Sequence, residues 1–298
     1  MRRACLRLFL LGLSLLAGCT TIEEGGGVTA TAEPVLETAS PSPTAAATPR
    51  ATSTHEPTVT PRPTPTEAPE MVEFTILYDN NPDVEGLRTG WGFACLIELP
   101  EGTLLFDTGG DGAALLANFE ALGKDPRSVD VVVLSHAHGD HTGGLAALLE
   151  SGAAPDVYVP AGASVSSRQV EVNEPQELLP GVWTTGAVRG SVTEQALVVQ
   201  TVEGGILVTG CAHPGIVRLT RRAQEVVGDE IHLVMGGFHL QGESAVRIEG
   251  LIEELQVLGV EAAAPSHCSG AAARRLFKEA FGEQGYLIGV GSTFRLER

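Results

Sequence analysis

Basic residues are scarce in this chain of 298 residues. It carries 19 Lys and Arg against 37 Asp and Glu, a formal net charge of −18 at pH 7. Nucleic acids and anionic lipid surfaces both attract proteins with clustered positive charge. The composition therefore argues against a nucleic-acid partner and against a polybasic attachment to membrane lipid. Any anionic substrate would have to be held by metal ions and by local groups.

Cysteine is also rare, with five residues in the whole chain. Cys5 and Cys19 lie near the N-terminus, which leaves Cys95, Cys211 and Cys268 for the remainder. An odd set of three makes a poor disulfide framework. Cys95 lies in the strand-like segment GFACLIEL and is most simply a small core residue. Cys211 and Cys268 each lie within two residues of a histidine. For each of them, a structural role and a role at a metal centre are both open alternatives.

The apolar run near the N-terminus, Leu8–Leu16, is too short to span a bilayer comfortably. Three arginines flank its start, and the residues LAGC end at Cys19. This arrangement predicts an export signal over residues 1–18. It resembles a bacterial lipoprotein signal, which implies that Cys19 becomes the lipidated first residue of a protein anchored on the outer face of a bacterial membrane. An ordinary signal peptide with a chance cysteine and a retained anchor helix are the alternatives.

Aromatic and branched apolar residues are nearly missing from residues 19–71. This segment holds nine of the 18 prolines and is rich in Thr, Ala and Ser. Such a composition cannot bury enough surface to offset the entropy of the chain. We predict a disordered tether over residues 19–71, followed by one folded domain over residues 72–298.

Alternating or periodic apolar residues predict the elements of that domain. Strands are expected over residues 72–78, 93–99, 103–106, 131–134, 155–160, 195–202, 205–209, 231–235, 260–264 and 286–294. Helices are expected over residues 113–122, 216–227, 245–258 and 271–281, and helical spacing also begins at Leu145. Residues 161–190 are rich in Gly, Pro, Ser and Glu and predict no element.

Four potential metal ligands lie within six residues in the segment VVVLSHAHGDHTGG. His136 and His138 are two apart, so they leave an extended chain on the same side and can share one ion. Asp140 and His141 follow Gly139, which can bend the chain and aim them at an adjacent point. Imidazole and carboxylate suit zinc, iron or manganese, and loops after strands are where α/β folds build sites. The segment therefore predicts a metal site.

The run H-x-H-x-D-H, here SHAHGDHTGG, resembles the central motif of the metallo-β-lactamase superfamily. The resemblance extends to Asp79-Asn80, LLFDTGG, TGCAHPG, GGFHL and PSHCSG. Together these segments resemble the branch commonly labelled dihydropterin ribofuranosylaminobenzene phosphate synthase. The resemblance covers residues 72–298 and implies an α/β fold, the αββα sandwich of two mixed sheets face to face with helices outside. It says little about the substrate, because fold does not determine function.

The resemblance also implies two divalent ions and a set of ligands for them. The expected ligands are His136, His138 and His213 for one ion and Asp140, His141 and His267 for the other. A core or capping histidine is the alternative for His213. Zinc suits a histidine-rich set best, and manganese or iron is compatible with the same residue types.

Three further residues have candidate roles at this centre. Asp107 closes a predicted strand, and the resemblance implies that it hydrogen-bonds beside the metal loop; a turn-forming residue is the alternative. Cys211 stands where many superfamily members carry an aspartate that bridges two ions, which puts the usual bridge in doubt. His239 follows two glycines at a strand end, where it could ligate, donate a proton or grip the substrate. We favour the last two roles, and an ordinary turn histidine is the alternative.

The predicted function is a surface-anchored metal-dependent hydrolase acting on a small-molecule phosphoester, lactone or other ester. A hydroxide bridging two ions would attack, Asp140 would orient it, and His239 would act as acid or substrate clamp. The alternative is a metal-retaining binding or sensing lipoprotein with little turnover. His138 disfavours the flavin-linked di-iron branch, which resembles H-x-E-x-D, and the loops match β-lactamases poorly. A cytosolic synthase reaction is hard to reconcile with an export signal.

Overall fold

The computed structural model describes residues 70–165 and 169–298. The predictions of a signal over residues 1–18, of lipidation at Cys19 and of the tether up to residue 69 concern residues outside these ranges. The first strand begins at Met71, one residue before the predicted start of the domain. Within the described ranges, no helix is long and apolar enough to cross a membrane.

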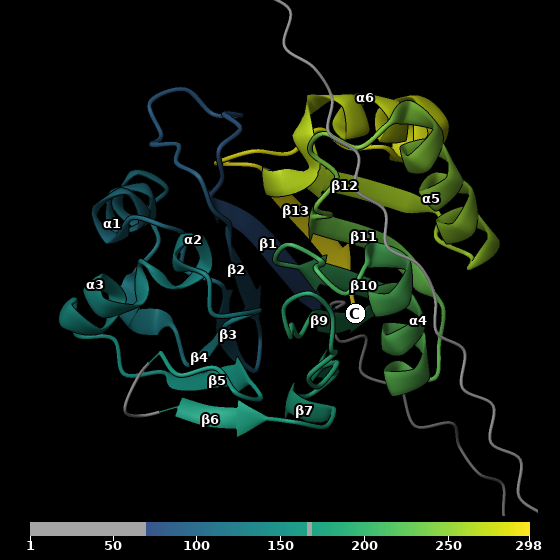
Figure 1. The fold of residues 1–298 in the computed structure, drawn as a ribbon. Coiled ribbons are helices and arrows are strands. Elements are labelled where there is room, and N and C mark those ends of the chain that lie inside the picture. Colours follow the sequence, from purple (N-terminus) through teal and green to yellow (C-terminus); the bar gives the residue numbers. More distant parts are fainter. Residues whose placement is uncertain (1–69, 166–168) are drawn as a thin grey trace, which may run out of the picture. The chain divides into compact units, whose positions relative to one another are not determined.

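Two β-sheets form the centre of the domain (Figure 1). In the described part of the chain, the first sheet has the order β13-β1-β2-β3-β4-β5-β6. Its strands are β1 (Met71–Tyr78), β2 (Ala94–Leu99), β3 (Gly102–Phe106), β4 (Val131–Val133), β5 (Asp156–Pro160), β6 (Gln169–Val172) and β13 (Thr293–Glu297). The pairs from β13 to β3 are antiparallel and those from β3 to β6 are parallel, so the sheet is mixed. All three valines of β4 are buried, as expected for β-branched residues in a central strand.

The second sheet has the order β12-β11-β10-β9-β8-β7 among the described residues. Its strands are β7 (Gln176–Leu179), β8 (Val182–Thr184), β9 (Leu197–Thr201), β10 (Gly204–Thr209), β11 (Ile231–Gly237) and β12 (Ala262–Ser266). β9 and β10 form an antiparallel hairpin, whereas β10, β11 and β12 run parallel. The carboxyl ends of these three parallel strands therefore lie at one edge of the sheet.

Helices cover the outer face of each sheet (Figure 1). They are α1 (Gly112–Ala121), α2 (Gly139–Thr142), α3 (Leu145–Glu150), α4 (Ile216–Val227), α5 (Ala245–Val257) and α6 (Gly270–Phe281). One apolar cluster lies between the two sheets, and two more fill the spaces between each sheet and its helices. The predicted αββα sandwich is confirmed.

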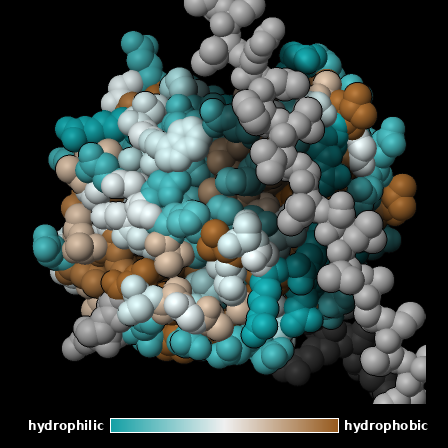
Figure 2. Space-filling model, in the orientation of Figure 1, coloured by the Kyte–Doolittle hydropathy of each residue, from teal (hydrophilic) through white to brown (hydrophobic). Residues whose placement is uncertain are grey.

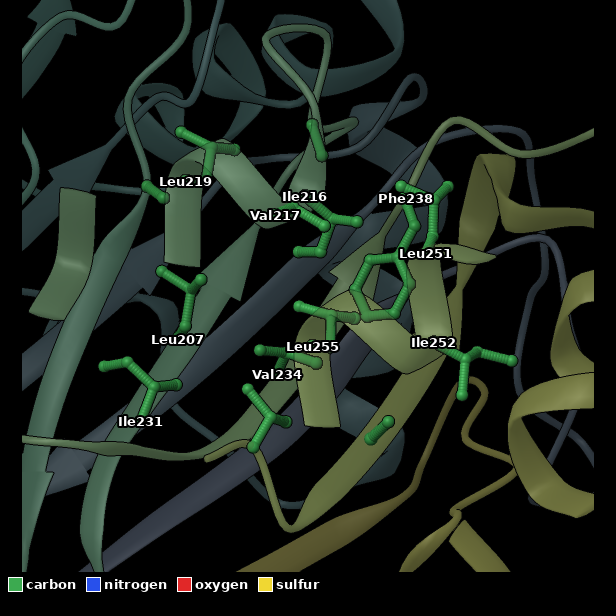
Figure 3. Close-up of a cluster of buried hydrophobic side chains, with 14 of the residues drawn as sticks. Leu207, Ile216, Val217, Leu219, Ile231, Val234, Phe238, Leu251, Ile252 and Leu255 are labelled. Carbon is green, nitrogen blue, oxygen red and sulfur yellow. The ribbon is translucent and has the colours of Figure 1, made fainter. Parts of the chain in front are cut away.

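The apolar layer between the second sheet and its helices places the loops that follow β10 and β11 (Figure 3). Leu207 and Val234 from the sheet pack with Ile216 of α4 and Leu255 of α5. The helix α4 follows directly on the predicted TGCAHPG segment and ends at Gly228, whose φ of 68° suits a glycine. Because α4 is fixed against this layer, the loop before it has little freedom.

Replacing Leu255 with alanine is expected to lower the free energy of unfolding by about 2–5 kcal/mol, because truncation leaves a cavity in a close-packed interior. Val257, on the same helix and 87% exposed, provides the control. Its replacement by alanine should change the free energy by no more than about 0.5 kcal/mol. Urea denaturation of both variants measures the difference. Equal effects would contradict the packing of α5 described above.

The final strand was predicted over residues 286–294, and this prediction is wrong. β13 begins only at Thr293, after a stretch that bends at Gly291, where φ is 95°. Val290 makes an isolated bridge to Pro82 instead of joining the sheet. Ile288 and Val290, before Gly291, are buried loop residues, which apolar content alone does not distinguish from strand. Residues 161–190, for which no element was predicted, contain the three short strands β6, β7 and β8.

Candidate metal centre

The candidate metal centre collects the loops that follow five strands, β3, β4, β10, β11 and β12. Each loop delivers predicted site residues within a few positions of its strand end. They are Asp107 after β3, His136 to His141 after β4, Cys211 and His213 after β10, His239 after β11, and His267 after β12. Residues far apart in the sequence thus meet at one edge of the sandwich, as expected for strands whose carboxyl ends lie together.

His136, His138 and His213 form the first group of potential ligands. Their ligand atoms all lie within 4.8 Å of one another. His136 Nε2 and His138 Nδ1 approach to 3.0 Å, close to the roughly 3.3 Å that separates two nitrogens bound to one tetrahedral zinc ion. Burial lowers the pKa of His136 to about 2, so its ring is neutral, as a ligand must be.

The prediction that an extended chain brings His136 and His138 together is wrong, although the two rings do meet. β4 ends at Val133, so the extended spacing does not continue to the histidines. His138 instead precedes the short helix α2, and this helical turn carries Asp140 and His141. This helical turn, rather than a bend at Gly139, directs the side chains of Asp140 and His141 toward the second group of potential ligands.

The second group consists of Asp140, His141, Cys211 and His267, again with ligand atoms within 4.8 Å of one another. Asp140 Oδ2 lies 3.6 Å from His141 Nε2 and 3.4 Å from His267 Nε2. Cys211 Sγ lies 3.2 Å from His141 Nε2. His267 Nε2 is buried and makes no hydrogen bond to any described residue. A buried nitrogen of this kind, facing a carboxylate and a thiol, fits a divalent ion such as zinc.

Asp107 holds one histidine of each group. Its Oδ2 lies 2.6 Å from His141 Nδ1 and accepts a hydrogen bond of 2.7 Å from Ser135 Oγ. The same Ser135 hydroxyl lies 2.9 Å from His136 Nδ1. Both histidines are therefore held through Nδ1, so that Nε2 faces the ligand groups. Outer partners of this type orient ligands and increase their basicity.

Asp79 and Asn80, which directly follow β1, form hydrogen bonds with His267. Asn80 Nδ2 donates to the His267 carbonyl at 3.3 Å, which turns Asn80 Oδ1 toward His267 Nδ1 at 3.0 Å. The oxygen can only accept, so the proton lies on Nδ1 and the lone pair of Nε2 points to Asp140. Asp79 accepts from the Ser266 hydroxyl and, at 3.2 Å, from the His267 backbone N–H.

Glu194 is a site residue that the sequence analysis missed. Its Oε1 accepts the backbone N–H groups of Cys211 and Ala212 at 2.9 and 2.8 Å. Its Oε2 accepts the N–H of His213 at 2.8 Å and lies 3.0 Å from His213 Nδ1. Burial would raise the pKa of Glu194, but His213, His136 and these N–H groups lower it to about 2. A lone glutamate before the β9 strand carries no motif, so the sequence offered no signal beyond a charge next to an apolar run.

His239 and Cys268 form a third group with Cys211, with ligand atoms within 4.8 Å of one another. Cys268 Sγ accepts the His239 backbone N–H at 3.3 Å. The His239 ring is exposed, its centroid lies 4.6 Å from that of His213, and its hydrogen bond with Cys268 raises its pKa. His239 therefore stands at the open side of the centre with a proton available.

The backbone is strained at this centre. Among the described residues, those other than glycine with positive φ are Asp107 (58°), Ala212 (58°), His239 (53°) and His267 (46°). All four belong to the loops of the centre. Such conformations cost roughly 1–3 kcal/mol each and persist where the surroundings over-determine them, typically at functional sites.

Comparison with known proteins agrees with this geometry. The sequence profile of the metallo-beta-lactamase superfamily matches residues 91–227, the region that carries the histidine run and His213. The crystal structure of Tm1679, a metal-dependent hydrolase of the β-lactamase superfamily, superposes with a TM-score of 0.65 at 26% identity, over 76% of this chain and 100% of that one. The profile match and the superposition show that this chain has the metallo-β-lactamase fold. The metallo-β-lactamase fold protein YhfI from Bacillus subtilis, with a TM-score of 0.54 at 13% identity over 76% of this chain and 99% of its own, shares the fold.

Two curated proteins are similar to this chain in sequence. A 7,8-dihydropterin-6-methyl-4-(beta-D-ribofuranosyl)-aminobenzene-5'-phosphate synthase from Methanocaldococcus jannaschii is 29% identical over 262 residues, covering 68% of this chain and 89% of the relative. The human metallo-beta-lactamase domain-containing protein 1 is 36% identical over 131 residues, covering 41% of this chain and 48% of the relative.

Replacing Asp107 with asparagine is expected to weaken metal binding by about 10–100-fold, because His141 loses its carboxylate partner. Competition with a chelator measures the affinity. The control is Asp125→Asn, an exposed aspartate at the start of a short 3-10 helix. If Asp107→Asn and Asp125→Asn bind metal equally well, Asp107 does not hold the ligands.

Proposed function

We propose that this protein is a metal-dependent hydrolase that binds two divalent ions, with zinc as the first candidate, and cleaves a phosphoester, lactone or other ester of a small molecule. The observation that carries the proposal is the buried His267 Nε2, which lacks a hydrogen-bonding partner among the described residues and faces Asp140. The separate group of three histidines supports a second ion. Similarity to a metal-dependent hydrolase points the same way, whereas the similarity to a synthase leaves the reaction open.

His136, His138 and His213 would hold one ion, and Asp140, His141 and His267 the other, with Cys211 as a further donor to the second. Bound divalent ions supply Lewis acidity toward an electrophile and a water molecule. The Asp140 carboxylate, which is ionised near neutral pH, can orient a water molecule and accept its proton at Oδ2.

His239 is placed to donate a proton to the leaving group. Its ring is exposed beside His213, and its raised pKa favours the protonated form. Trp91 borders the centre on another side, with its ring centroid 4.9 Å from that of His267 and half of its surface exposed. An exposed indole at this position can pack against the organic part of a substrate.

The test combines metal content with turnover on the same purified protein. We expect about two ions per chain by elemental analysis and hydrolysis of at least one member of a phosphoester and lactone panel. Asp140→Asn should reduce turnover by at least about 100-fold, the lower range for loss of a general acid or base. The control is Asp156→Asn, an exposed residue of β5. Bound ions without turnover would instead favour a metal-retaining binding or sensing protein. Cys211 supports this alternative, because it stands where many superfamily members carry a bridging aspartate.

We also propose that a lipid on Cys19 anchors the protein to a bacterial membrane. The proposal rests on the basic start, the short apolar run and the LAGC segment. Cys19→Ser should lose both the lipid label and sedimentation with membranes. If Cys19→Ser still carries a lipid label, the assigned attachment site is wrong.

A further inference from the structure

Four arginines line one surface pocket of about 460 Å³ beside α4. Arg218, Arg221 and Arg222 come from α4, where spacings of three and four residues put them on one face of the helix. Arg189 comes from the loop between β8 and β9. Figure 2 shows a strongly hydrophilic surface over the α4 region. This cluster is unexpected in a chain whose net charge is −18.

The positive charge of the pocket is only partly neutralised by the protein. Arg222 lies 3.3 Å from Glu225 and 3.8 Å from Glu174, and Arg221 lies 3.7 Å from Glu254. Neither Arg189 nor Arg218 has a carboxylate partner within the described ranges. Bringing like charges together is unfavourable unless an anion joins them.

Backbone oxygens hold two of the guanidinium groups in place. Arg218 Nη1 donates to the Arg189 carbonyl at 2.6 Å, and Arg222 Nε donates to the Thr185 carbonyl at 3.2 Å. A guanidinium has five N–H donors, so most of those on Arg218 are left for a ligand. Fixed guanidinium groups lose little freedom when they bind, and their planar geometry matches a phosphate.

The loop that carries Arg189 also packs against the metal centre. A Cβ atom added to Gly190 would lie 2.7 Å from Pro214 Cα and 3.0 Å from the His213 carbonyl oxygen. Glu194, at the end of the same loop, holds the His213 backbone N–H. The loop between β8 and β9 therefore contacts both the arginine pocket and the candidate ligand His213, although the pocket contains none of the candidate ligands.

We propose that the pocket of Arg189, Arg218, Arg221 and Arg222 is a binding site for a phosphate dianion or the phosphate group of an ester. The ligand could be a soluble phosphate compound or the phosphomonoester headgroup of a lipid, since both offer the same chemistry to guanidinium groups. The site is separate from the metal centre, so the inference does not depend on hydrolysis.

Calorimetric titration of the full-length protein with inorganic phosphate tests the site. The double variant Arg218→Gln/Arg222→Gln should lose at least about 100-fold in affinity, taking about tenfold for each charge-assisted hydrogen bond removed. The matched control is Arg127→Gln/Arg275→Gln, two exposed arginines outside the pocket with carboxylate partners of their own. Arg218→Lys/Arg222→Lys keeps the charge but not the planar donors, so it should bind with intermediate affinity.

Two further arms separate the possible origins of a signal. If phosphate binds at the metal centre, Asp140→Asn should change its affinity and the arginine variants should not. That result would overturn the proposal. An absence of saturable binding would overturn it as well. Circular dichroism of each variant verifies the fold. Vesicles of phosphatidylcholine with and without phosphatidic acid distinguish the sources. Arginine-dependent sedimentation only with phosphatidic acid assigns a lipid headgroup. Arginine-dependent phosphate binding without such sedimentation assigns a soluble ligand.

Discussion

Replacing His267 with alanine is expected to remove one ion from the protein and to abolish turnover. The side chain offers a lone pair that no described residue uses, and its orientation is set by Asn80. Loss of an outer partner alone costs about 10–100-fold in metal affinity, so loss of a ligand should exceed about 100-fold. Elemental analysis should fall from about two ions per chain to about one.

His232→Ala is the control for this experiment. The His232 side chain of β11 lies between Glu203 and Glu261 and contacts no residue of the metal centre. Its removal should leave metal content and turnover unchanged. An unchanged metal content in His267→Ala would show that His267 is not a ligand, and the second ion would then need a different donor set.

Replacing Glu194 with alanine is expected to destabilise the protein by roughly 3–5 kcal/mol, the range for breaking a buried charged pair. Three backbone N–H groups and the His213 ring would lose their acceptor inside the domain. Each unsatisfied buried donor costs about 1–3 kcal/mol, and partial relaxation of the loop keeps the total below their sum. Urea denaturation measures the change.

Glu203→Ala provides the matched control, because Glu203 is an exposed glutamate whose only ion pair within residues 70–165 and 169–298 is with His232. Exposed pairs contribute no more than about 1 kcal/mol. Glu194→Gln keeps the shape but places an N–H₂ group opposite donors, so its stability should lie between those of Glu194→Ala and the unchanged protein. If Glu194→Ala unfolds at the same urea concentration as Glu203→Ala, the carboxylate does not hold the loop.

The sequence predicted the parts of the site that are encoded locally. His136 to His141 lie within six residues, and their chemistry is evident from residue types alone. His267 was found only through resemblance, and Asn80 was given no role, because the two residues are 187 positions apart and spacing cannot join them. The contact between Glu194 and the loop after β10 follows from a strand order that sequence periodicity does not specify.

The fold was predictable where one apolar face is continuous. α4 has the predicted bounds, since its apolar residues keep helical spacing up to Gly228. The strands β6 and β7 have mostly half-buried or exposed residues, and β8 has only three residues, so none of them gives a strong alternating pattern. The arginine pocket was not anticipated, because Arg189 reaches the α4 arginines only through the packing of its loop on Pro214.

The residues that orient the histidines bear on the order of folding and metal binding. Asp107, Glu194 and Asn80 position their histidines through hydrogen bonds between protein groups alone. The shape of the centre is thus carried by the chain and by its apolar layers, in contrast to small zinc domains that fold only around their ion. We therefore expect folding and metal binding to be separable, so that the domain folds first and its ligand groups take up ions afterwards.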